Sequence, residues 1–129
     1  MAKPKAILDT SIVIDLVTNL PAARQWAVNF DLRTASVASV TIMEVLAGAQ
    51  NKQELQKLGR YLAKFYELHL LKQDSVWAVR HFRQFWLSHQ IGMSDCFIGA
   101  IAARTQLPLY TLNIKDFKPL PGVTAIKPY

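Results

Sequence analysis

Short apolar segments alternate with longer amphipathic stretches along the whole chain, and this alternation limits the fold more than any other sequence feature. The apolar segments have the length of buried strands, and the stretches between them have the length of helices. This alternation predicts an α/β sandwich around a mostly parallel sheet of four to five strands. The expected strands are residues 5–9, 34–38, 68–71, 107–112 and 123–126.

The stretches between these segments have the periodicity and the end signals of helices. Asp74 is the expected N-cap of one long helix. The last of the helices is apolar on nearly every side, so we expect it to be buried. The expected helices are residues 11–18, 21–30, 41–49, 53–67, 74–89 and 94–105. The expected apolar stripe of helix 74–89 consists of Ala78, Val79, Phe82, Phe85 and Trp86.

The composition favours one compact folded unit. The chain has 129 residues, of which 51% are apolar and 19% are charged, and this is enough apolar material for a core. A disordered chain would combine low hydrophobicity with high charge, and this chain has neither property. Because no linker or internal repeat divides the sequence, we expect residues 1–129 to form a single domain.

The sequence offers little support for a membrane or an oxidising compartment. Its longest stretch without Asp, Glu, Lys or Arg is residues 84–94, whereas a membrane-spanning helix needs about 20 apolar residues. Asp9 and Asp15 interrupt the N-terminal apolar stretch, which argues against a secretory signal. Cys96 is the single cysteine, so no internal disulfide can form. We therefore expect a cytoplasmic protein without a membrane anchor.

The charge balance suggests a polyanionic partner. Fifteen Lys and Arg residues against nine Asp and Glu residues give a net charge of +6 and a pI near 9.7. Small basic domains often bind nucleic acid. Ordinary solubility charge is the alternative, since a net charge of about 2–8 is common for a small domain. The positions of the nine acids are therefore more informative than the total.

Four acids fall near the same edge of the expected sheet. Asp9 ends the first strand, Glu44 lies early in the helix after the second, Asp95 opens the all-apolar helix, and Asp116 follows the fourth strand. Ligands of parallel α/β folds bind beyond the carboxyl ends of the strands. Converging carboxylates repel one another unless a cation lies between them. Mg²⁺ and Mn²⁺ prefer such oxygen ligands, and they assist phosphodiester hydrolysis.

Each acid also has a purely structural alternative, which the residues leave open. Thr41-x-x-Glu44 matches a capping box, in which Glu44 would only stabilise a helix start. Asp95 would be favoured by the dipole of its helix, and Asp9 could cap the helix that follows it. Asp116 could be a turn residue. A residue can be both a cap and a metal ligand, so these alternatives do not exclude the metal site.

Four segments in this order resemble the PIN-domain ribonucleases, and most closely the VapC toxins of VapBC toxin–antitoxin modules. They are LDTSIVIDL at 8–16, SVTIMEVLAG at 39–48, SDCFIGAIA at 94–102 and TLNIKDF at 111–117. The resemblance implies a PIN-like α/β/α sandwich and an endoribonuclease that depends on Mg²⁺ or Mn²⁺. It also implies an RNA substrate, a cognate VapB-like antitoxin and a homodimer. Residues 50–92 match no motif of the family.

The resemblance also assigns roles to residues. Asp9 and Asp95 correspond to the closest metal ligands of the family. Glu44 and Asp116 would bind a second ion, hold water, or do both. Thr111 and Asn113 match supporting polar positions of the family, and Thr10 or Ser11 is expected to hydrogen-bond a carboxylate.

RNA must reach this acidic edge, so basic residues should surround it. The candidates for phosphate contacts are Lys115, Lys118, Arg80 and Arg83, and the alternative for each is a solvated surface charge. The histidines, among them His89, lack the spacing of metal ligands, and we interpret them as structural or surface residues.

The sequence therefore predicts a divalent-metal-dependent endoribonuclease that acts as a toxin. Two alternatives remain. One is a PIN-type nuclease that processes RNA and has no toxin role. The other is a non-enzymatic α/β interaction module whose carboxylates are only helix caps.

Overall fold

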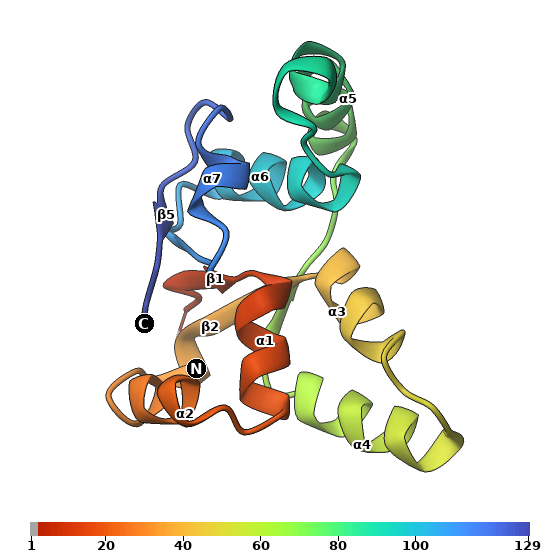
Figure 1. Ribbon diagram of the computed structural model, residues 1–129, viewed down its shortest axis with the longest axis vertical. Coiled ribbons are helices and arrows are strands. Elements are labelled where there is room, and N and C mark those ends of the chain that lie inside the picture. The colour runs from red at the N-terminus through yellow and green to blue at the C-terminus, as the bar shows by residue number, and fades with distance from the viewer. Residues whose placement is uncertain (1–2) are drawn as a thin grey trace.

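A five-stranded sheet in which every paired strand is parallel forms the middle of the molecule, in the computed structural model shown in Figure 1, which describes residues 3–129. The strand order is β3-β2-β1-β4-β5. The strands are β1 (Ala6–Leu8), β2 (Ala35–Ala38), β3 (Tyr66–Leu68), β4 (Leu109–Tyr110) and β5 (Ala125–Ile126). The predicted α/β sandwich with a parallel sheet is confirmed.

Helices cover both faces of the sheet. Neighbouring side chains of a strand point to opposite faces, and on both faces these side chains are apolar and buried. Ile7 of β1 belongs to a buried cluster with α5, α6 and α7, whereas Leu8 belongs to a second cluster with α1 to α4. Figure 1 shows these two layers above and below the sheet. The helices are α1 (Thr10–Val17), α2 (Pro21–Val28), α3 (Ser39–Leu46), α4 (Lys52–Leu62), α5 (Lys72–His89), α6 (Met93–Thr105) and α7 (Ile114–Phe117), with a 3-10 turn at Leu32–Thr34.

Several expected element boundaries are wrong. The helix expected at 53–67 ends at Leu62, and the third strand begins at Tyr66, before the expected 68–71. Within 53–67, the apolar positions Tyr61 and Phe65 fit helical periodicity, but the chain leaves the helix to reach the sheet. The short helix α7 was not expected, because four residues are too few to show a period.

Asp74 is not the N-cap of α5. The cap is Leu71, and the Asp74 carboxylate accepts a hydrogen bond from the Leu71 N–H at 2.9 Å. Asp74 is also buried, and Arg104 of α6 donates to its Oδ1 at 2.9 Å. In this orientation of α5, His81 is buried and Val79 is 55% exposed, which corrects the expected stripe. Trp86, also expected in the stripe, is 47% exposed.

None of the helices within residues 3–129 combines the length and the apolar character that crossing a membrane requires.

Candidate active site

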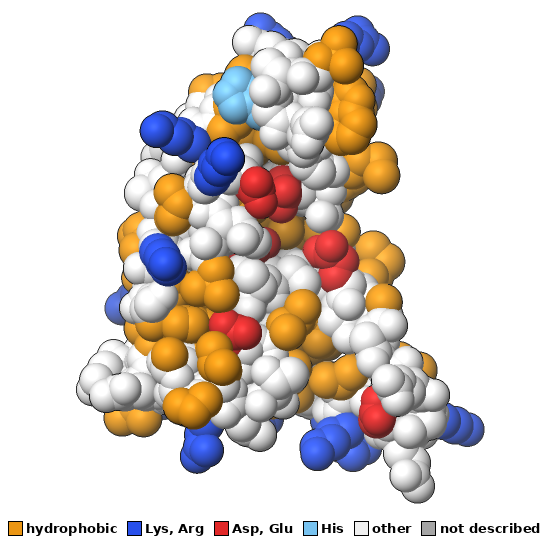
Figure 2. Space-filling model, in the orientation of Figure 1, with side chains coloured by type: hydrophobic (Ala, Val, Ile, Leu, Met, Phe, Trp, Pro, Cys, Tyr) orange, Lys and Arg blue, Asp and Glu red, His pale blue; other side chains and the backbone are white. Residues whose placement is uncertain are grey.

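The ends of β1 and β4 bring the acids predicted from the sequence toward one edge of the sheet. Asp9 follows β1 directly and is 3% exposed. Its N–H donates to the Tyr110 carbonyl of β4 at 2.9 Å, so the backbone position of this acid is fixed by sheet pairing. Figure 2 shows acidic side chains in the middle of one face, between the helices α6 and α7 above and α1 and α3 below.

Two hydroxyl groups hold the Asp9 carboxylate. Ser11 Oγ and Thr111 Oγ1 both donate to Asp9 Oδ2, at 3.0 and 2.7 Å. Each hydroxyl oxygen also accepts a backbone N–H, from Leu112 for Ser11 and from Asn113 for Thr111. Because a hydroxyl has a single hydrogen, these accepted bonds leave that hydrogen free to point at Asp9. Asn113 therefore supports the site through its backbone N–H.

Burial raises the pKa of Asp9, while the hydroxyl groups of Thr111 and Ser11 lower it in part. Burial penalises the charged carboxylate, and hydrogen bonds to the charged form favour it. The net direction is upward. The fold thus places an acid where its charge is costly and then surrounds it with donors.

Glu44 reaches the site from α3 and has one strong partner. Thr10 Oγ1 donates to Glu44 Oε1 at 2.7 Å and also lies 3.1 Å from Thr41 Oγ1. Thr41 is the third residue of α3, and the N-cap of that helix is Ala38. The capping-box alternative for Glu44 is therefore wrong. Thr10 and Glu44 connect α1 to α3 at the edge of the acidic site.

Asp95 is the third residue of α6 and lies beside the N-cap, Gly92. The Gly92 N–H donates to its carboxylate, so the predicted helix-start role is present. However, burial and the charges of Asp9, Asp116 and Glu44 together raise the pKa of Asp95 to about 7. The other acids therefore act on Asp95 more strongly than its helix start does. Asp95 is therefore within electrostatic reach of each of the other three acids.

Asp116 lies on α7 and is exposed at the rim. Its N–H donates to the Asn113 carbonyl at 3.0 Å, which closes the single turn of this helix. Asp116 therefore lies in a short helix rather than in a turn. This helix positions the Asp116 carboxylate next to the acidic cluster. Lys115 precedes Asp116, and Lys118 is the C-cap of α7.

The donor set suits a hard divalent cation, because it consists of carboxylate oxygens that repel one another. Within residues 3–129, no three His, Cys, Asp or Glu side chains already form a ready-made metal site. An ion would therefore have to draw the carboxylates closer together. Burial and the neighbouring acids both raise the pKa of Asp95, and a bound cation would oppose both effects.

Two of the predicted RNA contacts lie in a different place. Arg80 and Arg83 line a surface pocket of α5 together with Ser75, Val76 and Val79, and none of the four acids lines it. Lys115 and Lys118, by contrast, belong to the helix that presents Asp116. The structure therefore keeps the two lysines within two residues of Asp116 and places the two arginines at a separate pocket.

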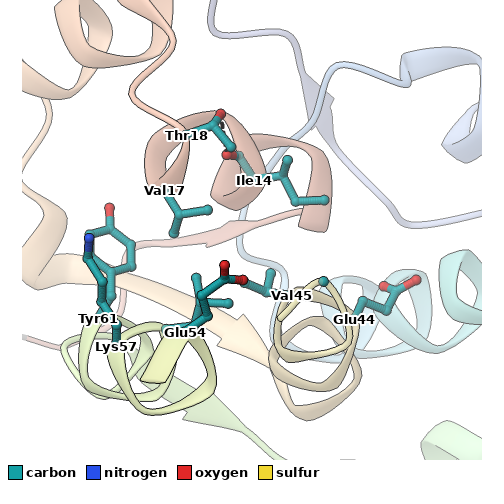
Figure 3. Close-up of a pocket in the computed structure, with 10 residues that line it drawn as sticks. Ile14, Val17, Thr18, Glu44, Val45, Glu54, Lys57 and Tyr61 are labelled. Atoms are coloured by element: carbon teal, nitrogen blue, oxygen red, sulfur yellow. Dashed lines mark hydrogen bonds between the residues drawn. The ribbon is translucent and has the colours of Figure 1, made fainter. Parts of the chain in front are cut away.

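A groove that no sequence motif revealed begins at Glu44. It has a volume of about 490 Å³ and lies between α1, α3 and α4. Figure 3 shows Ile14 and Val17 on one wall, Tyr61 on another, and Glu44 at one end. The sequence feature that could have indicated this groove is the apolar face of the helix expected at 53–67. Leu58 and Tyr61 of that face line the groove together with residues of α1.

Comparisons with known proteins agree with this geometry. A PIN domain model matches residues 6–120. A ribonuclease VapC from Rickettsia bellii is 28% identical in an alignment of 128 positions that covers 93% of this chain and 93% of that protein. A toxin–antitoxin complex from Klebsiella pneumoniae contains a chain that superimposes with a TM-score of 0.78, at 27% identity, over 96% of this chain and 98% of that chain.

A DNA-bound VapBC complex from Salmonella typhimurium superimposes with a TM-score of 0.76 over 95% of this chain and 97% of that chain. Its identity is 19%, so this match shows the shared fold alone. The family model, in contrast, spans β1 through the residues after α7 and includes all four acids. The chain therefore belongs to the PIN domain family.

Proposed function

We propose that this protein is an endoribonuclease that depends on Mg²⁺ or Mn²⁺, hydrolyses RNA phosphodiester bonds in the cytoplasm, and serves as the toxin of a type II toxin–antitoxin module. The observation that supports it most is the group of four coupled carboxylates, Asp9, Glu44, Asp95 and Asp116, on a PIN fold. The similarity to a protein named ribonuclease VapC supports the same activity.

The four acids have different proposed roles in metal binding. Asp9 and Asp95 are the nearest candidates to hold a divalent ion, and Glu44 and Asp116 complete the site from α3 and α7. When bound, such an ion neutralises charge on the phosphodiester and activates the attacking water. Ser11 and Thr111 keep Asp9 oriented, and Thr10 keeps Glu44 oriented. Lys115 and Lys118 lie where they can attract the RNA backbone.

Cleavage of a mixed tRNA and rRNA pool tests this proposal. Wild type and Asp95→Ala are compared side by side with Mg²⁺, with Mn²⁺ and with EDTA. We expect cutting by wild type alone and only with metal. Equal cutting by both proteins would contradict the assigned site. Absence of cutting, together with no thermal shift from either metal, would support a non-enzymatic interaction module instead.

A cognate antitoxin is the expected inhibitor, as the similarity to chains from toxin–antitoxin complexes suggests. The groove between α1, α3 and α4 could receive part of it, because the groove is mostly apolar and ends at Glu44. A segment lying there would cover the approach to the acids. A small reading frame beside the gene would supply the candidate partner and would separate a toxin from an RNA-processing nuclease.

A variant pair tests the groove. Ile14 lines it and is 42% exposed, whereas Val28 is 82% exposed on α2 and does not line it. Ile14→Asp should release the nuclease from inhibition by the candidate partner, and Val28→Asp should not. Equal inhibition of both variants would place the partner on another surface.

A homodimer is also part of the proposal, and exposed apolar side chains indicate a surface for it. Two shallow pockets share Phe97. Met93 is 70% exposed beside one of them, and Met43 is 62% exposed beside the other. Exposed apolar side chains beside two adjoining pockets are typical of an interface. Light scattering should find that Met93→Glu is monomeric and that wild type and Val28→Glu are dimeric.

A further inference from the structure

A small polar pocket shares Asp116 with the acidic site. Its volume is about 300 Å³, and it lies between the end of α5 and α7. This volume is at the low end of small-ligand pockets, roughly 300–1,000 Å³, so it suits a single nucleotide better than a helix or a duplex. Its lining residues are Leu87, Ser88, His89, Gln90, Lys115 and Asp116.

The backbone after α5 builds this pocket. Gln90 adopts a left-handed conformation with φ of 50°, which ends the helix directly after His89. Two residues later, Gly92 is the N-cap of α6, whose third residue is Asp95. The short connection between α5 and α6 therefore joins the pocket residues His89 and Gln90 to the helix that carries Asp95. The pocket and the acidic site are parts of one local structure.

The His89 ring is exposed to solvent, and two neighbouring side chains contact it. Ser88 Oγ lies 2.7 Å from His89 Nδ1. Phe85 packs against the ring edge to face, with the ring centres 5.4 Å apart. An aromatic ring fixed in this way beside an open pocket is a suitable surface for stacking an unpaired base.

The lining also supplies the polar groups that a nucleotide needs. The Lys115 ammonium can pair with a phosphate, and the Gln90 amide can both donate to and accept from the edge of a base. Asp116 is the one acid among the described residues that line the pocket, and it belongs to the site where the phosphodiester would be cut. Figure 2 shows Lys or Arg side chains next to the acidic group on the α7 side.

We propose that this pocket binds the nucleotide of a single-stranded RNA next to the scissile phosphate, with its base against His89 and Gln90 and its phosphate against Lys115. The inference rests on the proposed nuclease function. It assigns a binding role to His89, which the sequence indicated only as a structural or surface residue, and it makes Gln90 and His89 determinants of the cleavage sequence.

Binding is measured apart from cleavage, in an Asp95→Asn background and without divalent metal, with a fluorescent single-stranded RNA pool that contains 4-thiouridine. We expect His89→Ala to weaken binding about tenfold, the size expected for one stacked base. Lys115→Ala should lower the slope of log affinity against log salt by about 0.7, as expected for one phosphate contact on a single strand. His69→Ala and Lys52→Ala are the matched controls and should change neither quantity.

Photocrosslinking of the same RNA locates the contact directly. We expect 4-thiouridine crosslinks within residues 87–90, and we expect His89→Ala to lose them. Crosslinks elsewhere, with unchanged affinity in His89→Ala and Lys115→Ala, would overturn the pocket. Binding too weak to measure in every protein would also overturn it.

A parallel experiment compares RNA cleavage by wild type and by Asp95→Asn with Mn²⁺. Its outcome decides the nuclease proposal independently of the pocket. If wild type cuts, His89→Ala should broaden the nucleotide preference on one side of the cut, and an unchanged preference would contradict the pocket.

Discussion

The two sides of the acidic cluster are stabilised differently. On the side of α1 and α3, Asp9 receives hydrogen bonds from two hydroxyl groups, and Glu44 receives one from Thr10. On the side of α6, the Asp95 carboxylate receives the Gly92 backbone N–H, and its pKa is raised to about 7. Asp9 is thus held in a fixed orientation, whereas Asp95 can change its charge near neutral pH.

The two environments show how a fold can hold acids together before a cation binds. On the buried side, the hydroxyl groups of Ser11 and Thr111 orient the Asp9 carboxylate. Burying this charge without hydrogen-bond donors would cost much free energy. The other side tolerates crowding, because Asp95 can bind a proton instead of remaining charged. A divalent ion would then replace that proton. The side of Asp9 and Glu44 is thus an oriented side, and the side of Asp95 is a titrating side.

The largest expected effect is on catalysis. Asp9→Asn and Asp95→Asn should each reduce metal-dependent RNA cleavage by about 1,000-fold or more, since the charge stabilisation at stake is several kcal/mol. Single-turnover cleavage with Mn²⁺ measures it, with circular dichroism to check the fold. A large loss in one variant and near-normal activity in the other would show that cleavage does not require both carboxylates.

The second prediction concerns the oriented side alone. Thr111→Val removes the hydroxyl that donates to Asp9 at 2.7 Å and keeps the shape of the side chain. We expect cleavage to fall about 10- to 100-fold, the usual effect of losing a group that orients a metal ligand. Thr111→Ser restores the hydroxyl and should recover most of the activity. Equal activity of the Val and Ser variants would show that the hydrogen bond has no positioning role.

Most of the fold could be predicted from the sequence, because most strands consist of apolar or small buried residues and most helices between them are long enough to show a period. The errors concern short or tertiary features. Helix α7 has four residues, and α5 is joined to α6 by the ion pair between Asp74 and Arg104, which are 30 residues apart. No local pattern encodes such a pair.

The candidate site, like the fold, was predictable only in part from local sequence patterns. The order of Asp9, Glu44, Asp95 and Asp116 along the chain was sufficient to propose them as a group. Their unequal environments were not predictable, because they depend on which hydroxyl faces which carboxylate across 102 residues, as for Thr111 and Asp9. The groove at Glu44 and the pocket at His89 arise where helices from the unmatched region, residues 50–92, pack beside the site.

The third prediction concerns metal binding on the titrating side. Because a cation must displace the proton from Asp95, the affinity for Mn²⁺ should rise about tenfold per pH unit below pH 7 and level off above it. Calorimetric titration at pH 6, 7 and 8 measures this. Asp95→Asn should bind Mn²⁺ weakly with a much flatter dependence. A steep dependence that persists in Asp95→Asn would assign the displaced proton to another acid.

The smallest expected effect is on the stability of the metal-free protein. The folded-state pKa of Asp95 is raised above its unfolded value of 3.8 to about 7, so the folded state binds the extra proton between these two values. The stability of wild type should therefore fall as the pH rises from about 4 to about 7. Asp95→Asn removes this loss and should be more stable than wild type at pH 8, by about 1–2 kcal/mol after allowance for solvent screening.

Asp9→Asn provides the contrast that makes this measurement decisive. The pKa of Asp9 is also raised, but its carboxylate accepts hydrogen bonds from Ser11 and Thr111, which an amide satisfies less well. We expect no gain in stability, or a loss, for Asp9→Asn. Urea unfolding at pH 4 and pH 8 compares the three proteins without metal. Equal stabilisation by both variants at pH 8 would mean that simple repulsion governs both acids and that the hydroxyl groups do not distinguish the two sides.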